Sequence, residues 1–472
     1  MSNYPTGLPL RGLVVAMAAT LLGACSMIPV FERPAAPVPA SFPQAAPAAS
    51  AAPLAEALAW RDYFADERLR SVIALALDNN RDLRVAALNI ERARAQYGIQ
   101  RADLFPSIAV SGGQSAQRVP ADLSATRQAD ITRQYSANLG FASYELDFFG
   151  RVRSLEEQAL QTYLGTEEAR RSAQISLVAE VASTWLRLAA DRERLALARN
   201  TFETRKKSFE LTQRSFELGA VSALDLRQAE TLLQTARADA ARYAAVVAQD
   251  ENALALVVGA GVPAELQPDA LGARVAAVGE LPAGVPAEVL ARRPDILQAE
   301  RALMAANASI GAARAAFFPR ITLTASAGTA SSALDGLFDG GSGAWSFVPQ
   351  IRLPIFEAGR LQASLDVAEI QRDINVAQYE KAIQSAFREV ADALAERATL
   401  AEQLDARRKL VEAANKSFEL SEARYQGGVD SYLNLLDAQR TLYGAELELI
   451  ATRLADATNR VALYKALGGG WQ

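Results

Sequence analysis

A tandem duplication constrains the fold of this chain of 472 residues more than any other feature of its sequence. Residues of the first half recur 213 positions later, and farther along the spacing becomes 209 positions. The matched residues include Asp82 and Asp295, Gly98 and Gly311, Phe105 and Phe318, Pro106 and Pro319, Gly150 and Gly359, Gly219 and Gly428, and Gly259 and Gly468. The duplication predicts two copies of one structural unit of roughly 200 residues, each with the same order of elements.

Each copy contains a long stretch without a helix breaker. No Pro occurs between Pro120 and Pro263, and none follows Pro354. Apolar residues recur at every seventh position through Val181, Leu188, Leu195, Phe202, Phe209 and Phe216, and less regularly through Leu404, Val411, Phe418 and Tyr425. This spacing is typical of coiled-coil packing. We expect helices from near Arg151 to Glu217 and from near Arg360 to Gln426, each on the order of 100 Å long at 1.5 Å per residue.

A short break interrupts each helical stretch. The breaks consist of Gly219, Ala220 and Val221 in the first copy and Gly427, Gly428 and Val429 in the second. Gly can adopt the left-handed conformation that ends a helix, and heptad spacing resumes directly after each break. Each break is therefore predicted to be the tip of a helical hairpin, the second of which covers residues 357–467.

Ahead of each long helix the apolar spacing changes to period two. In the second copy the apolar residues Ile321, Leu323, Ala325 and Ala327 alternate with polar ones, as do Trp345, Phe347, Ile351 and Leu353. The first copy has a weaker version, near Ile108–Gly112 and Ala137–Leu146. These patterns predict two β-hairpins, at about residues 107–147 and 320–354, with about nine residues per strand.

Strands of this length could cross a membrane, but four strands cannot close a barrel, and open sheet edges are not tolerated in lipid. One reading is that the chain supplies part of a barrel. The other is that two water-facing hairpins pack on the helices, and the strand pattern alone favours neither.

The composition excludes most catalytic chemistry. The chain contains no His and a single Cys, so the commonest general base and Cys-based metal clusters are absent. Acidic pairs such as Glu156–Glu157 and Glu167–Glu168 diverge around a helix and cannot converge on one bond. The net charge of −5 provides no basic footprint for nucleic acid. We therefore expect neither an enzyme nor a cofactor, metal or nucleic-acid site.

The N-terminus indicates export. Arg11 precedes an apolar run from Leu13 to Leu22, which has the length of a signal-peptide core. The run ends in Leu22-Gly23-Ala24-Cys25, which resembles the lipobox of bacterial lipoproteins. We expect a signal peptide at residues 1–24, a lipid on Cys25, and a lipidated tether at residues 25–60 that is rich in Ala, Pro and Ser. Ser26, rather than Asp, favours the outer membrane, although an ordinary cleavage site with a chance Cys is the alternative.

These features together resemble the outer-membrane factor family, in its TolC/OprM-like lipoprotein branch of the NodT/OprM type. The residues that carry the resemblance are Trp60-Arg61-Asp62-Tyr63-Phe64, Asn80-Arg81-Asp82-Leu83, Arg292-Arg293-Pro294-Asp295-Ile296, Phe317-Phe318-Pro319 and Phe356-Glu357-Ala358-Gly359-Arg360-Leu361. The resemblance implies a mixed α/β membrane protein. Three copies with four strands each would form a transmembrane β-barrel of twelve strands, continued by a long α-helical periplasmic barrel.

The resemblance also implies a function and a domain order. The two repeats would cover residues 61–260 and 295–472, joined by an equatorial linker at residues 261–294. The homotrimer would be the outer-membrane channel of a tripartite efflux system, with a periplasmic adaptor at the hairpin tips and an RND-type transporter in the inner membrane. The alternatives are the outer-membrane duct of a type I secretion system and a coiled-coil structural lipoprotein without a pore.

Five positions correspond to the periplasmic gate and lumen of the family. They are Asp225, Tyr425, Asp430, Asn434 and Asp437. Asn434 departs from the doubly acidic pair of some members, and Asp430 stands where some members carry an Arg, so a locking network of Tyr and Arg cannot be transferred unchanged. Helix capping is the alternative role for Asp225 and Asp430. Asp437 lies beyond the first turn of its helix, where an exposed helix face is the alternative to a lumen role.

The lipid anchor can be tested alone. We expect Cys25→Ser to abolish acylation while trimers still form, because a barrel would carry its own lipid-facing surface. Metabolic labelling with palmitate measures the acylation, and label that persists in the variant would refute the assignment.

Overall fold

The computed structural model describes residues 26–43, 58–125, 127–272 and 287–471. The predicted signal peptide, Cys25 and residues 44–57 of the predicted tether lie outside the described residues. The chain divides into two compact units. Unit 1 comprises Met1–Ala35, Asn89–Thr166 and Gln298–Tyr379, and unit 2 comprises Ala36–Leu88, Glu167–Leu297 and Glu380–Gln472.

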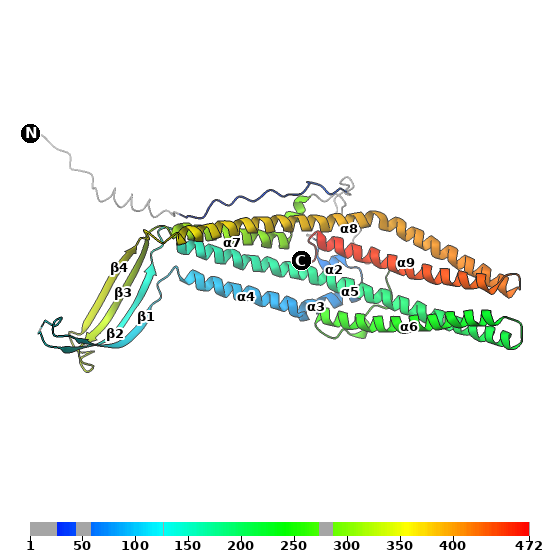
Figure 1. The fold of residues 1–472 in the computed structure, drawn as a ribbon, viewed down its shortest axis with the longest axis horizontal. Coiled ribbons are helices and arrows are strands. Elements are labelled where there is room, and N and C mark those ends of the chain that lie inside the picture. The colour runs from blue at the N-terminus through cyan, green and yellow to red at the C-terminus, as the bar shows by residue number, and fades with distance from the viewer. Residues whose placement is uncertain (1–25, 44–57, 126, 273–286, 472) are drawn as a thin grey trace, which may run out of the picture. The chain divides into compact units, whose positions relative to one another are not determined.

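The elements follow the order of the repeat (Figure 1). The first copy has α3 (Glu67–Asn79), α4 (Arg81–Ala102), β1 (Ala109–Val119), β2 (Asp130–Glu145), α5 (Arg151–Glu217) and α6 (Ala223–Val258), preceded by the short α2 (Trp60–Tyr63). The second copy has α7 (Pro294–Ala315), β3 (Arg320–Ser331), β4 (Gly343–Arg352), α8 (Arg360–Gln426) and α9 (Tyr432–Ala466). The 3₁₀ helices η2 (Ala264–Leu266) and η3 (Ala287–Arg292) lie between the copies.

The long helices begin and end where the sequence predicts. α5 and α8 each have 67 residues. Gly219 and Gly428 end them with left-handed backbone, at φ values of 73° and 68°. After each Gly, the next residue donates its amide five residues back, from Ala220 to Ser215 and from Val429 to Arg424. The bonds satisfy carbonyls that the helix end leaves open, and they turn the chain into α6 and α9.

The core of unit 2 includes an aromatic stack that joins the start of the first copy to the end of the second. The Tyr63 and Tyr464 rings are parallel, with centroids 3.9 Å apart. Burial would leave both hydroxyls unsatisfied, but Tyr63 donates to the Arg460 carbonyl and Tyr464 to the Leu58 carbonyl. The stack therefore fixes α2 against α9.

Unit 1 contains one antiparallel sheet of four strands, in the order β1-β2-β3-β4 (Figure 1). The two hairpins meet where β2 pairs with β3, and a bulge between Phe141 and Tyr144 shifts that pairing by one residue. Within the described residues, β1 and β4 each pair on one side only, so both outer edges present unpaired backbone groups. The four strands predicted for the chain are confirmed. β1 and β2 lie within the span predicted for the first hairpin, residues 107–147, but with 11 and 16 residues they are longer than the nine residues per strand that the pattern predicted.

The two faces of the sheet differ in polarity. Residues directly opposite in the register share a face. One face is mainly apolar and includes Val110, Leu139, Phe141, Ile321, Leu323, Ala325, Ala327, Trp345, Phe347 and Ile351. The other is mainly polar and includes Ser111, Ser136, Asn138, Thr322, Thr324, Ser326, Ser346 and Gln350. The apolar face is not covered within the chain, since Trp345 is 80% exposed and Ile351 is 69% exposed.

Among the described residues, no helix combines the length and the apolar character needed to cross a bilayer.

Candidate functional site

The two helical hairpins pack against each other close to their tips in unit 2. The centre of this cluster consists of Ala229 from α6 and Tyr432, Leu435 and Leu436 from α9. Partly buried side chains from α5, α6 and α8 surround it, namely Phe209, Leu232, Phe418 and Tyr425. The heptad positions Phe209, Phe418 and Tyr425 thus meet in one apolar contact, which holds the tips together.

Tyr425 lies at the edge of this cluster. Its ring centroid is 5.2 Å from that of Tyr432, and the planes are tilted by 45°. Burial raises the pKa of Tyr425, and the negative charge of Asp225 raises it further. Tyr425 therefore remains a neutral phenol that contacts its own hairpin partner, with a carboxylate of the other hairpin close by.

Asp225 forms the capping box that its spacing from Ser222 predicts. The Asp225 amide donates to Ser222 Oγ at 3.2 Å, and the Ser222 amide donates to Asp225 Oδ2 at 3.1 Å. Ser222 Oγ also donates to the same carboxylate oxygen at 2.7 Å. The carboxylate therefore satisfies the first turn of α6.

Asp430 connects the two arms of the second tip. Its carboxylate pairs with Arg424 Nε at 3.1 Å and accepts from Asn434 Nδ2 at 2.6 Å. It also accepts from the Ser431 amide. The hydrogen bond from Arg424, then those from Asn434 and Ser431, hold the pKa of Asp430 below its usual value. The sequence did not identify Arg424, which supplies the cation from the arm before the tip.

Asp437 lines a groove between α5, α6 and α9. The groove has a volume of about 470 Å³, and Arg205, Asp239, Arg440 and Tyr443 also line it. Tyr443 Oη donates to Asp239 Oδ2 at 3.3 Å, which joins α9 to α6. Arg205 is only 7% exposed, and burial lowers its pKa. Asp437 is exposed, and two arginines share its groove, so the local charge is balanced rather than purely acidic.

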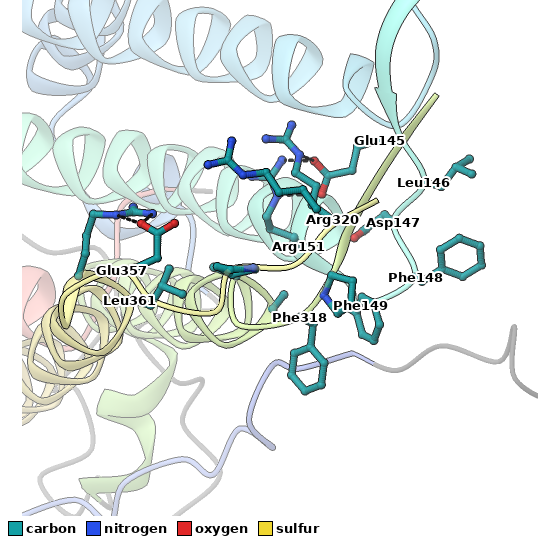
Figure 2. A pocket seen from close by; sticks show the side chains of 16 residues that line it. Glu145, Leu146, Asp147, Phe148, Phe149, Arg151, Phe318, Arg320, Glu357 and Leu361 are labelled. Atoms are coloured by element: carbon teal, nitrogen blue, oxygen red, sulfur yellow. Dashed lines mark hydrogen bonds and ion pairs between the residues drawn. The ribbon is translucent and has the colours of Figure 1, made fainter. Parts of the chain in front are cut away.

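At the other end of the helices, a buried carboxylate joins strands to helix in unit 1. Figure 2 shows Glu145 between Arg151 and Arg320, at a cavity of about 280 Å³. Glu145 accepts two bonds from Arg151, at 2.9 and 2.7 Å, and pairs with Arg320 at 2.6 Å. Beside this cluster Phe149 stacks on Phe318 at 4.9 Å. Glu145 thus binds the end of β2 to the starts of α5 and β3.

The segment that follows Cys25 is docked on α7 in unit 1. Asn307 Nδ2 donates to the Pro29 carbonyl at 2.7 Å. Ile28 lies against Gly311, where an added Cβ would come within 2.6 Å of the Ile28 side chain. The matching Gly98 of the first copy has nothing within 4 Å of that position. The close approach is therefore specific to the second copy.

An ion pair completes this docking. Arg33 donates two bonds to Glu300, at 2.8 and 2.9 Å, and the Glu300 side chain is only 6% exposed. Ser26, at the start of the segment, lines a cavity together with Gly150 and Arg153 at the beginning of α5. The residue after the predicted lipid attachment site thus lies beside the helix start that follows the sheet. Cys25 itself is outside the described residues.

Within the described ranges, no cluster of three or more Asp, Glu, Cys or His side chains could hold a metal ion. The chain instead combines a sheet with one apolar face, long paired helices and charged side chains near the hairpin tips. The family model for outer membrane efflux proteins matches residues 72–260 and 285–469. The chain belongs to the outer membrane efflux protein family.

Close relatives share nearly the whole chain. The probable efflux pump outer membrane protein TtgC of Pseudomonas putida is 54% identical over 463 residues, covering 97% of this chain and 95% of the relative. Outer membrane protein OprJ of Pseudomonas aeruginosa is 47% identical, covering 98% and 96%. The open state of the outer membrane channel MtrE of Neisseria gonorrhoeae is 41% identical with a TM-score of 0.86, covering 95% and 99%.

The family, the function and the location predicted from the sequence are confirmed. The chain is an outer-membrane channel of an efflux system, and it lies in the outer membrane. The family is one of channels rather than of enzymes. The individual gate residues and the lipid on Cys25 stay predictions.

The docked segment gives a first test. We expect Arg33→Ala to destabilise the protein by about 1–3 kcal/mol, because it leaves the buried Glu300 carboxylate without its cation. Adding Glu300→Gln should recover part of the loss. The control is Arg314→Ala, which breaks the more exposed pair with Glu369 and should change stability by less than about 1 kcal/mol. Thermal unfolding measures all variants, and equal effects of Arg33→Ala and Arg314→Ala would contradict the buried pair.

The tips give a second test. Tyr425→Ala removes an aromatic contact from the cluster that holds the hairpins together, so we expect a higher resting conductance. Asp437→Ala removes a carboxylate from the groove, so we expect weaker cation preference or weaker block by cations. Planar-bilayer recordings measure both properties. If both variants match the wild type, these residues only support the helices and the gate lies elsewhere.

Proposed function

We propose that three copies of this chain form one continuous exit duct for a tripartite efflux pump. Each copy contributes four strands to a transmembrane barrel of twelve strands and its long helices to a periplasmic tunnel. A periplasmic adaptor binds near the hairpin tips at residues 219–221 and 427–429, and an RND-type transporter in the inner membrane supplies the substrate. The duct performs no chemistry on what passes through it.

One observation carries this proposal, namely a two-faced sheet with two unpaired edges. A band of exposed apolar side chains on one face suits lipid, and the mainly polar face suits a water-filled lumen. Backbone groups at an open edge cannot be left unpaired in hydrocarbon. β4 of one copy therefore pairs with β1 of the next, and the ring of strands closes.

The internal repeat predicts the register of this missing pairing. In the first hairpin Val110 pairs with Leu139, and in the second Leu323 pairs with Pro349. β1 thus corresponds to β3 with a shift of 213, and β2 corresponds to β4 with a shift of 210. The observed β2–β3 pairing can then be transferred to β4 and β1 of a neighbouring copy.

The transfer assigns each pair. Because Ala137 pairs with Thr329, Phe347 should pair with Ala116 of the neighbouring copy. The other pairs follow the same rule and are Ile351 with Gly112, Pro349 with Gln114, and Trp345 with Arg118. All of these residues lie on the apolar face, so the transferred register keeps that face continuous around the ring.

The docked N-terminal segment supports a lipid on Cys25 as a second attachment to the membrane. Ser26 lies beside the start of α5, the helix that follows β2 in the sequence. An acyl chain on the preceding Cys would therefore begin close to the end of the sheet that adjoins the helices. The anchor and the barrel would then enter the same membrane from adjacent points.

The relatives suggest a class of substrate. Relatives from Pseudomonas putida are described as efflux pump proteins for toluene, solvent and antibiotics. We propose small apolar or amphipathic organic molecules as the substrates of this system.

The predicted register has a direct test. We expect the double variant Ala116→Cys with Phe347→Cys to form disulfides between copies, because residues directly opposite in antiparallel strands have Cα atoms about 4.5–5.5 Å apart. Denaturing electrophoresis without reductant would show chains joined into dimers and trimers. Cys25 is the only natural Cys, and single variants reveal any background from it.

The matched control moves the Cys in β4 by one residue and keeps the Cys in β1. Ala116→Cys with Val348→Cys places the two thiols on opposite faces of the sheet, so we expect little product. Efficient cross-linking of the control pair but not of the predicted pair would refute the register. Absence of any cross-link between copies in either variant, in membranes that contain the protein, would refute the closed ring itself.

A further inference from the structure

Two arginines lie on the otherwise apolar face of the sheet, at its loop end. Arg118 of β1 pairs with Ile131, and Arg133 of β2 pairs with Ala116. Both arginines therefore share the face of Val110 and Leu139, and they are diagonal neighbours about 7–8 Å apart. Both side chains are exposed. They form a compact pair of positive charges on the side that the barrel would present to lipid.

Their position along the strand matches the boundary of a bilayer. On this face β2 presents Phe141, Leu139, Ala137, Tyr135 and then Arg133. The eight residue steps from Phe141 to Arg133 cover about 27 Å of strand, and strand tilt shortens the height that this represents. The apolar band thus ends with the aromatic side chain of Tyr135, a residue type typical of membrane interfaces, and Arg133 is the next residue on this face.

Neither arginine is neutralised by an acidic side chain of the described residues, among which no ion pair to Arg118 or Arg133 occurs. Asp130 is close in sequence, but it belongs to the alternate set of strand residues and accepts a bond from the Ile131 amide. Two like charges on neighbouring strands disfavour each other unless an anion bridges them. The two arginines therefore favour a bound anion, and no carboxylate on their face of the sheet supplies it.

The second hairpin does not repeat the feature. The shifts of 213 and 210 map Arg118 to Ser331 and Arg133 to Gly343. A general need for cations at the rim would be met in both hairpins, whereas only the first carries them. The pair is thus one specific site per copy.

We propose that Arg118 and Arg133 bind the phosphate groups of a lipid headgroup in the outer leaflet of the outer membrane. A guanidinium binds phosphate through two parallel hydrogen bonds, and two guanidinium groups at this spacing suit a headgroup with more than one phosphate. At the interface the long side chains extend toward the headgroups at little cost. The inference rests on the proposed function, because it requires the apolar face to lie in lipid.

The test compares lipid binding by matched variants of the full-length protein. Native mass spectrometry measures binding of lipid A with two phosphates to the wild type, to Arg118→Gln with Arg133→Gln, and to Arg352→Gln. Arg352 is the control because it is an exposed Arg on the opposite face, across from Arg320. We expect the double variant to bind about tenfold more weakly, since it loses charge-assisted hydrogen bonds, and the control to bind as the wild type does.

Two further lipids identify the source of the phosphate. For lipid A without phosphates, we expect the double variant to bind almost as tightly as the wild type. For phosphatidylglycerol, we expect its loss of affinity to be smaller than its loss for lipid A with both phosphates. Equal binding of the intact lipid A by the wild type and the double variant would overturn the proposal, as would a larger loss for phosphatidylglycerol. A double variant that still forms the cross-linked ring but keeps full lipid affinity refutes this inference and leaves the proposed function intact.

Discussion

The unpaired backbone at the two edges of the sheet is the constraint on which the architecture depends. Each N–H and C=O group left unsatisfied in hydrocarbon costs several kcal/mol, so a strand edge of ten residues cannot stay open in a membrane. The apolar face requires lipid, and the edges forbid lipid unless another copy pairs with them. An assembly that closes the sheet satisfies both requirements. The duplication makes such an assembly natural, because the β2–β3 contact inside the chain already provides the geometry that β4 and β1 need between copies.

The helical ends are held by weaker and more local interactions. A small apolar cluster joins the hairpins near their tips, and around it Asp225 caps α6 while Asp430 connects Arg424 to Asn434. Exposed ion pairs of this kind contribute little each, typically below about 1 kcal/mol. The tips are therefore the part of the helical hairpins that a small energy can rearrange, which suits the gate predicted there. The sheet end differs, since the buried Glu145 cluster ties two strands and a helix together.

Residue patterns with a direct local cause were predictable. Gly219 and Gly428 end their helices because left-handed backbone is accessible to Gly, and Ser222 and Asp225 form a capping box because their spacing places each beside the other's amide. The strands of the first hairpin were predicted too short because Ser115, Gln117 and Arg118 do not resemble a buried strand. Contacts between distant residues were not predictable. Arg33 pairs with Glu300 across 267 positions, and no pattern in the sequence indicates the bulge between Phe141 and Tyr144.

The central claim is that this chain completes its sheet only with copies of itself. The protein is extracted from outer membranes in a mild detergent, and the detergent is removed from it in the mass spectrometer. Native mass spectrometry then counts the chains in each particle. We expect a particle of three chains. Phe347→Pro should disrupt this particle, because Pro in β4 removes a backbone donor from the ladder or clashes with the neighbouring strand. A stable particle of one chain, with the sheet intact, would contradict the closed ring.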